Sequence, residues 1–163
     1  MGTSGGCQCG AVRYAFDGAL RGPHLCHCRM CQKAAGNYFL ALGGVGREDF
    51  RVTRGTIARF ASSDLVRRGF CRDCGTPLTF ESADGETLSV TLGSLDDPAA
   101  VAPAEQHGVE GRVPWFDALA RLPERSDGDA TGEEAERLEA IASTNHQHPD
   151  RDTPDRAAPR GDG

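Results

Sequence analysis

The first 123 residues alternate short apolar runs with Gly, Pro and Asp, which is the pattern of many short strands. Between residues 87 and 92 the apolar side chains occupy every second position and therefore share one face of a sheet. The pattern predicts strands at residues 11–16, 38–43, 50–53, 57–61, 66–70, 77–81 and 87–92. We therefore expect a mainly β fold.

Two segments carry helix signals instead. Residues 29–36 hold good helix formers and end on a glycine, which predicts one or two helical turns. Further along, Thr131 and Glu134 have the spacing of a capping box, which predicts a short helix near residues 132–143. The pattern assigns this second helix no role.

The chain length suits one domain followed by a tail. From Glu124 onward Asp, Glu, Arg, Pro and Gly dominate, and few apolar side chains follow Ser143 to offset the entropy of ordering. We expect one folded domain in residues 1–123 and an acidic, mostly disordered tail in residues 124–163.

Charge separates the same two parts. The domain carries 13 acidic and 13 basic side chains and the tail 11 and 5, so the tail holds the net charge of −6. A domain without a Lys/Arg-rich stripe lacks the electrostatic footprint of a nucleic-acid reader. We expect no nucleic acid as a partner.

The sequence shows neither the pattern of a signal peptide nor that of a membrane span. The first residues hold no basic and apolar signal-peptide pattern, and no run approaches the ~20 apolar residues of a membrane span. We expect a cytoplasmic protein with no membrane partner.

In that reducing compartment seven cysteines, an odd number, indicate metal rather than disulfides. The sequence gives no oligomeric state.

Every cysteine belongs to one of three groups with ligand-like spacing: Cys7-x-Cys9, Cys26-x-Cys28-x-x-Cys31 and Cys71-x-x-Cys74. The first and last groups each end on a glycine, which can take the positive φ of a tight metal-binding turn. Structural zinc takes four protein ligands, whereas catalytic zinc keeps three and an open position. We interpret the outer groups as one structural site and the middle group as an open one.

Other arrangements are compatible with the same spacing. All seven thiols could form one irregular cluster, they could simply be buried, or both zinc ions could be structural, with His24 or His27 closing the second. His27 stands between two ligands on an extended stretch, where neighbouring side chains point apart, which favours a neighbouring role over coordination. His146 and His148 in the tail are interpreted as a chance polar pair.

Three thiolates would leave a zinc site with a formal charge of −1 and make the metal a weak Lewis acid. A substrate thiol, in contrast, would ionise on binding and become an oriented nucleophile. Such a thiolate can attack an aldehyde, and the reverse step expels it. The chemistry therefore favours formation or cleavage of a carbon–sulfur bond.

The sequence around the cysteines also resembles the glutathione-dependent formaldehyde-activating enzyme family, a kind of zinc domain that a centromere protein shares. The resemblance covers about residues 5–123 and rests on the cysteine groups and their flanking residues, on Gly93-Ser94-Leu95-Asp96-Asp97-Pro98, on His107 and on Pro114-Trp115-Phe116.

The resemblance implies a β-tent fold of small antiparallel sheets stapled by two zinc ions per chain. It places a structural zinc on Cys7, Cys9, Cys71 and Cys74 and a catalytic zinc on Cys26, Cys28 and Cys31. The implied reaction joins glutathione, as co-substrate, to formaldehyde to give S-hydroxymethylglutathione, and in reverse it is a carbon–sulfur lyase reaction. The implied partners are a small thiol and an aldehyde.

Arg29 and Lys33 lie four residues apart, on one face of the predicted first helix. They could guide the carboxylates of glutathione, or form an ordinary solvated pair. Five further residues could line the substrate pocket or pack in the core: Asn37, Tyr38, Phe39, His107 and Trp115.

Two other functions fit the same sequence. One is a non-catalytic zinc scaffold that binds a protein partner, and the other is a nucleic-acid module, against which the balanced charge of the domain argues.

Overall fold

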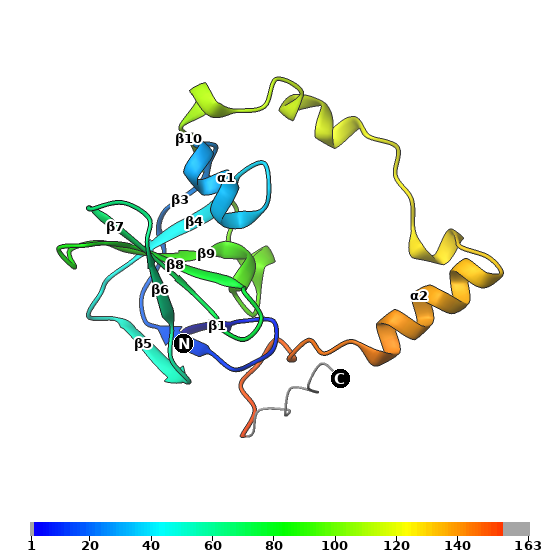
Figure 1. Ribbon diagram of the computed structural model, residues 1–163, viewed down its shortest axis with the longest axis horizontal. Helices are drawn as coiled ribbons and strands as arrows, with labels where there is room; N and C mark the ends of the chain where they lie inside the picture. Colours follow the sequence, from blue (N-terminus) through cyan, green and yellow to red (C-terminus); the bar gives the residue numbers. More distant parts are fainter. Residues whose placement is uncertain (1, 155–163) are drawn as a thin grey trace.

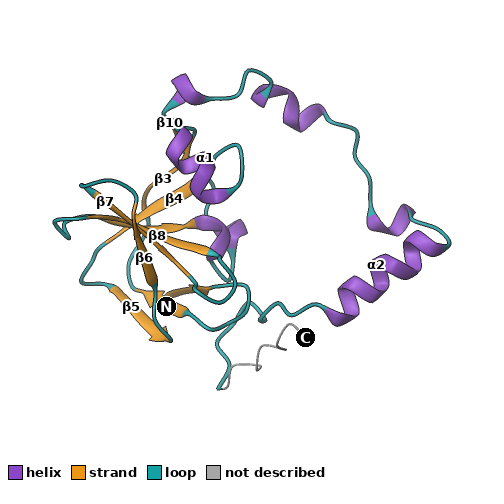
Figure 2. Ribbon diagram, viewed as in Figure 1, coloured by secondary structure: helices purple, strands orange, loops and turns teal. Residues whose placement is uncertain are grey.

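The computed structural model describes residues 2–154, which form two β-sheets, a few short helical segments between the strands and a run of helical segments after the last strand (Figures 1 and 2). The strands are β1 (Thr3–Gly6), β2 (Arg13–Phe16), β3 (Arg21–Cys26), β4 (Leu40–Val45), β5 (Phe50–Arg54), β6 (Ala58–Ala61), β7 (Val66–Phe70), β8 (Pro77–Ser82), β9 (Leu88–Thr91) and β10 (Glu105–His107). The α-helices are α1 (Arg29–Ala35) and α2 (Glu133–Thr144). The 3-10 turns are η1 (Leu92–Ser94), η2 (Pro98–Ala100), η3 (Val109–Gly111), η4 (Phe116–Arg121) and η5 (Asp127–Asp129).

The smaller sheet has the strand order β1-β2-β5, and all its pairings are antiparallel. Its central strand β2 is buried at every position. Because successive side chains of a strand point to opposite faces, both faces of β2 are covered.

The larger sheet has the order β10-β3-β4-β9-β8-β7-β6. Its pairings are antiparallel except that β10 runs parallel to β3, with Glu105 opposite His24 and His107 opposite Cys26. The sheet is therefore mixed, where the sequence predicted antiparallel sheets. The parallel pairing brings the chain after η2 beside the middle cysteine group.

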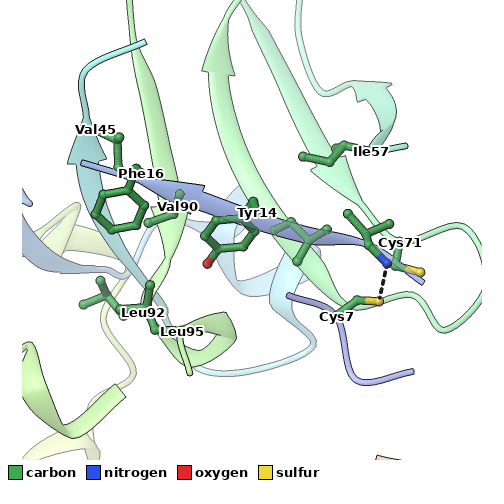
Figure 3. Close-up of a cluster of buried hydrophobic side chains, with 11 residues drawn as sticks. Cys7, Tyr14, Phe16, Val45, Ile57, Cys71, Val90, Leu92 and Leu95 are labelled. Atoms are coloured by element: carbon green, nitrogen blue, oxygen red, sulfur yellow. Dashed lines mark hydrogen bonds between the residues drawn. The ribbon is translucent and has the colours of Figure 1, made fainter. Parts of the chain in front are cut away.

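The main core joins side chains of both sheets around Tyr14, Phe16 and Val90, all at most 1% exposed (Figure 3). The same cluster continues into Cys7 and Cys71. In Figure 3 the dashed line marks the bond of 3.2 Å that the backbone N–H of Val12 donates to the Cys7 sulfur. The outer cysteine groups thus lie at the end of the hydrophobic core.

The mainly β prediction is confirmed, and each predicted strand overlaps an observed one. Three strands were not predicted: β1, β3 and β10. Their sequences, TSGG, RGPHLC and EQH, lack the apolar alternation that marks a strand, and β10 is exposed at all three positions.

The first predicted helix is α1, and Gly36 ends it in the left-handed conformation at φ 60°. Helix α2 lies where the second helix was predicted, but the expected cap is wrong, since Gly132 is the N-cap and no side chain caps the helix. A capping box occurs one turn earlier instead, between Ser126 and Asp129 around η5. Helix α2 has no buried residue and stands apart from the sheets in Figure 1.

Beyond α2 the chain returns to the sheets. The backbone N–H of His148 donates to the carbonyl of Gln8 at 2.7 Å, and Asp152 accepts a bond of 2.9 Å from Arg13. The division into a domain of residues 1–123 and a disordered tail of residues 124–163 stays a prediction, and Met1 and residues 155–163 lie outside the described residues. Within residues 2–154 no helix has the length and apolar character of a membrane span.

Candidate metal centres

The two outer cysteine groups meet in one cluster. Cys7 and Cys9 lie in the turn between β1 and β2, while Cys71 and Cys74 lie in the turn between β7 and β8. Their four sulfur atoms lie within 4.8 Å of one another. The Cys7 and Cys9 sulfurs are 3.7 Å apart, and Cys9 and Cys71 are 3.9 Å apart. The cluster therefore joins the smaller sheet to the larger one.

Glycine makes both turns of this cluster possible. Gly10 and Gly75 have φ of 71° and 78°, which other L-residues seldom adopt. Each glycine N–H bonds back to the first cysteine of its group, Gly10 to Cys7 at 3.0 Å and Gly75 to Cys71 at 2.9 Å. The turn geometry that the sequence predicted is confirmed.

A bound cation would stabilise the thiolate forms of the four cysteines in this cluster. Burial raises the pKa of Cys7 to about 12. Burial also disfavours the Cys74 thiolate, but the Thr76 hydroxyl, 3.2 Å from the sulfur, and other hydrogen bonds lower its pKa to about 6. Four converging thiol groups can be thiolates together only around a cation, and four sulfurs are the donor set of a closed zinc site.

The middle group forms a second, separate cluster. Cys26 ends β3, Cys28 precedes α1, and Cys31 lies in its first turn. Their sulfur atoms lie within 4.8 Å of one another, with 3.5 Å between Cys26 and Cys28. The seven thiols therefore form two groups, and the idea of one irregular cluster is wrong. Four and three cysteines are consistent with two metal sites.

The three thiols of this second cluster differ in their tendency to ionise. Burial raises the pKa of Cys26 to about 12. Burial disfavours the Cys28 thiolate as well, but the hydrogen bonds within the cluster and the positive charge of Arg68 lower its pKa. The cluster thus holds a positive charge beside it as well as thiol donors.

No histidine of residues 2–154 joins either group of candidate ligands. His27 is fully buried, its Nε2 lies 2.9 Å from the Gln106 amide oxygen, and its ring packs edge-on to Phe116 at 4.7 Å. His24 stacks on His107 with ring centroids 4.0 Å apart. His27 therefore supports the loop that carries the cysteines, in agreement with the neighbouring role expected for it.

A cavity of about 310 Å³ opens against the three-cysteine cluster. Its walls combine the cysteines with apolar and ionisable side chains from β3, β4, β7, β8, β10 and the start of α1: Cys26, Cys28, Cys31, His24, Met30, Leu42, Val66, Arg68, Phe80 and His107, with Ser62 and Ser89. The cluster is thus reachable by a small molecule.

Arg29 and Lys33 are not among the residues that line this cavity. Both side chains are exposed on α1, and Arg29 donates to the Gln32 amide oxygen at 3.2 Å. Their contact with a substrate stays a prediction.

The five predicted pocket residues separate into two sets. His107 lines the cavity. Tyr38 packs edge-on to Trp115 at 4.5 Å, Phe39 packs on Phe116 at 5.8 Å, and the Asn37 side chain accepts from the Tyr38 N–H. These four belong to the segments around α1 and η4 rather than to the cavity wall.

Sequence reasoning missed Arg68, which comes from β7. Its side chain is 8% exposed, and Nη2 donates to the Cys31 sulfur at 3.4 Å. Nε donates to the Ser62 hydroxyl at 3.0 Å, and the guanidinium lies 5.1 Å from the centre of the Phe80 ring. One signal existed: in the predicted strand, Arg68 shares a face with Val66 and Phe70, which is the inward face.

The fold and these two clusters define a class, that of small β proteins with one four-cysteine cluster and one three-cysteine cluster that a cavity reaches. A family model described as glutathione-dependent formaldehyde-activating enzyme matches residues 2–110. The chain belongs to this family, and the resemblance found in its sequence is confirmed.

Two individual proteins are similar to this chain at below 30% sequence identity. A Schizosaccharomyces pombe protein named as an uncharacterized lyase is 29% identical over 84 residues, which cover 50% of this chain and 59% of that protein. The match therefore spans less than two thirds of that relative. A Rhodobacter sphaeroides protein, whose crystal structure was a Northeast Structural Genomics target, is similar with a TM-score of 0.50 and 22% identity over 63% of this chain and 98% of that one. This similarity shows the fold alone.

Proposed function

We propose that this chain is a zinc-dependent carbon–sulfur lyase or synthase that acts on the adduct of a thiol and a small aldehyde, with glutathione and formaldehyde as the leading pair. One observation carries the proposal. Three sulfurs from Cys26, Cys28 and Cys31 converge at the wall of a cavity, and no fourth side chain of residues 2–154 joins them as a ligand. Family membership and a relative named as a lyase support it.

The two clusters have different roles in this proposal. Cys7, Cys9, Cys71 and Cys74 hold a structural zinc that ties the sheets together. Cys26, Cys28 and Cys31 hold a catalytic zinc, which when bound supplies a position where a substrate thiol ionises. Leu42 and Phe80 line the cavity with apolar surface, which limits the water that competes for the thiol.

The reaction conserves atoms and electrons without a redox partner. The substrate thiol gives up its proton and its sulfur attacks the carbonyl carbon. A carbon–sulfur bond forms, and the π electrons of the carbonyl move to its oxygen, which takes up a proton in exchange for the one that the thiol released. The reverse reaction returns that proton, breaks the carbon–sulfur bond and releases the aldehyde and the thiol.

NMR exchange spectroscopy tests the proposal, because it follows formaldehyde moving between its hydrate and its glutathione adduct at equilibrium. We expect the protein to accelerate exchange above the spontaneous rate. The Cys28→Ser variant should keep one zinc per chain and lose the acceleration. Exchange at the spontaneous rate with the original protein would refute the enzymatic role and favour a zinc scaffold. Equal acceleration by the variant and the original protein would refute the role of the three-cysteine cluster.

A further inference from the structure

Arg68 is a buried cation without a carboxylate partner in residues 2–154. The other strongly buried arginine, Arg13, differs, because Asp96 and Asp152 both accept hydrogen bonds from it. Burial of a charge is costly unless an opposite charge or full hydrogen bonding compensates. The described part of the fold supplies no carboxylate for Arg68. Its contact with the Cys31 sulfur, a thiolate when zinc is bound, occupies one donor, and the other donors have capacity for an anionic group of a ligand.

The hydrogen bonds of Arg68 leave most of its donors unused. A guanidinium carries five N–H donors in a planar fork. Ser62 accepts from Nε, and Cys31 accepts one bond from Nη2 through sulfur, a weak acceptor. Nη1 makes no hydrogen bond with the described residues. Because the buried polar atoms without a partner in residues 2–154 are His27 Nδ1 and His148 Nδ1, Nη1 itself is not fully buried. Its N–H groups are therefore open to the space that Arg68 lines.

That space is the substrate cavity and a second cavity beside it. Arg68 lines the cavity of about 310 Å³ with the three cysteines and also one of about 280 Å³ between Leu40, Phe60 and Phe70. At neutral pH it is the fixed positive charge on the wall of the first cavity, where the remaining side chains are apolar, thiol, hydroxyl or imidazole. An anionic group of a ligand would therefore move toward Arg68.

We propose that Arg68 binds a carboxylate of the substrate, so that the cavity prefers thiols that carry a carboxylate over neutral thiols. This inference rests on the proposed function, since it needs a thiol at the three-cysteine cluster. Contact between Nη2 and Cys31 places the guanidinium directly beside that cluster. The planar fork matches both oxygens of a carboxylate, which a lysine could not do.

Calorimetric titration of the zinc-loaded full chain tests the selectivity. The two probes are 3-mercaptopropionate, which carries a carboxylate, and 2-mercaptoethanol, which is neutral. We expect 3-mercaptopropionate to bind about tenfold more tightly, the scale of one charge-assisted hydrogen-bonding contact.

Substitutions assign that preference to one side chain. Arg68→Met should bind both thiols equally, at the affinity of the neutral probe, and Arg68→Lys should keep only part of the preference. Arg67→Met is the matched control, because Arg67 is the neighbouring residue of β7 and donates to the carbonyl of Ser63 instead. Arg67→Met should therefore keep the full preference.

The outcomes separate the two proposals. Equal affinity of the original protein for both thiols overturns the role of Arg68. A preference for 3-mercaptopropionate that survives in Arg68→Met also overturns it, because the metal would then bind the carboxylate directly. If neither thiol binds, the proposed function fails instead. Should Arg68→Met prove unfolded by circular dichroism, a full preference in folded Arg68→Lys overturns the inference, and a reduced one supports it.

Discussion

At the scale of single residues, the best-defined polar contact joins Arg13 to Asp96. Arg13 is 3% exposed and donates through Nη1 and Nη2 to the two carboxylate oxygens of Asp96, at 2.7 and 2.5 Å. Asp96 also accepts a bond of 2.5 Å from the Ser4 hydroxyl. Removal of Asp96 leaves the buried charge of Arg13 with Asp152, a partner that is 59% exposed, and the loss of a buried partner costs more than the pair itself contributes.

We therefore predict that Asp96→Asn lowers the free energy of unfolding by about 3 kcal/mol. Asp17→Asn is the control, since its pair with Arg51 is exposed at 62% and 53%, and it should change stability by at most about 0.5 kcal/mol. Urea denaturation of the zinc-loaded proteins measures both values. If both variants lost only about 0.5 kcal/mol of unfolding free energy, the predicted contribution of Asp96 to stability would be wrong.

The same contact predicts a pH dependence. Burial opposes ionisation of Asp96, but the hydrogen bonds from Arg13 and Ser4 and the Arg13 charge outweigh it and lower its pKa. A carboxyl whose folded pKa lies below its unfolded value of about 3.9 stabilises the fold above that value and loses this effect as pH falls through the folded pKa.

The stability difference between the original protein and Asp96→Asn should therefore be full at pH 7 and shrink below about pH 4. The difference is informative because both proteins share the acid sensitivity of their cysteine sites. Urea denaturation across this range provides the measurement, and a difference that stays constant to pH 3 would contradict the lowered pKa.

At the scale of elements, Gln32 fastens α1 to the rest of the domain. Its Nε2 donates at 2.8 Å to the carbonyls of His27 and Gly111, and the side chain is 8% exposed. These bonds fix the loop of Cys28 against η3. A buried carbonyl that loses its donor costs about 1–3 kcal/mol.

We predict that Gln32→Ala weakens zinc binding at the three-cysteine cluster while leaving the four-cysteine cluster unchanged. Transfer of zinc to a coloured chelator would show this as a faster first phase and an unaltered second phase. Lys33→Ala, the exposed neighbour on α1, should leave both phases unchanged. Acceleration of both phases alike in Gln32→Ala would show that the side chain acts on the whole fold.

The elements also show what the sequence could and could not predict. Local patterns located α1, because good helix formers and Gly36 lie within one short segment, and they located β9 through its apolar alternation. Strand β10 forms by pairing with β3, and β3 pairs with β4 on its other side, while the residues of both strands carry little signal of their own. Long-range pairing, rather than local preference, makes them strands.

The candidate site divides in the same way. The cysteine groups were predictable because ligand spacing is local. The cavity was not, since Leu42, Arg68 and Phe80 reach it from three strands that are separated along the chain. Closeness in sequence to the cysteines predicted a role for Arg29 and Lys33. It could not predict Arg68, which is 37 residues from Cys31 and yet contacts it.

At the scale of the whole molecule, the four-cysteine cluster links the turn before β2 to the turn after β7 and hence the two sheets to each other. Structural zinc supplies an apparent ~10–16 kcal/mol, as large as the ~5–15 kcal/mol stability of a domain. The three-cysteine cluster, in contrast, lies within one short stretch of chain and does not join the sheets.

We therefore predict that Cys74→Ser abolishes the cooperative thermal transition, whereas Cys28→Ser unfolds cooperatively with a modestly lower Tm. Scanning calorimetry compares the two variants, both of which replace a half-buried thiol with a hydroxyl. A cooperative transition in Cys74→Ser like that of the original protein would show that the sheets hold together without this cluster.

The central claim, one closed site and one site open to a thiol, is tested most directly by the absorption spectrum of the cobalt-substituted protein during a titration with glutathione. We expect two metal ions per chain and a saturable change in the sulfur-to-cobalt charge-transfer bands, which disappears in Cys28→Ser. Two bound metal ions with a spectrum that glutathione leaves unchanged would contradict it.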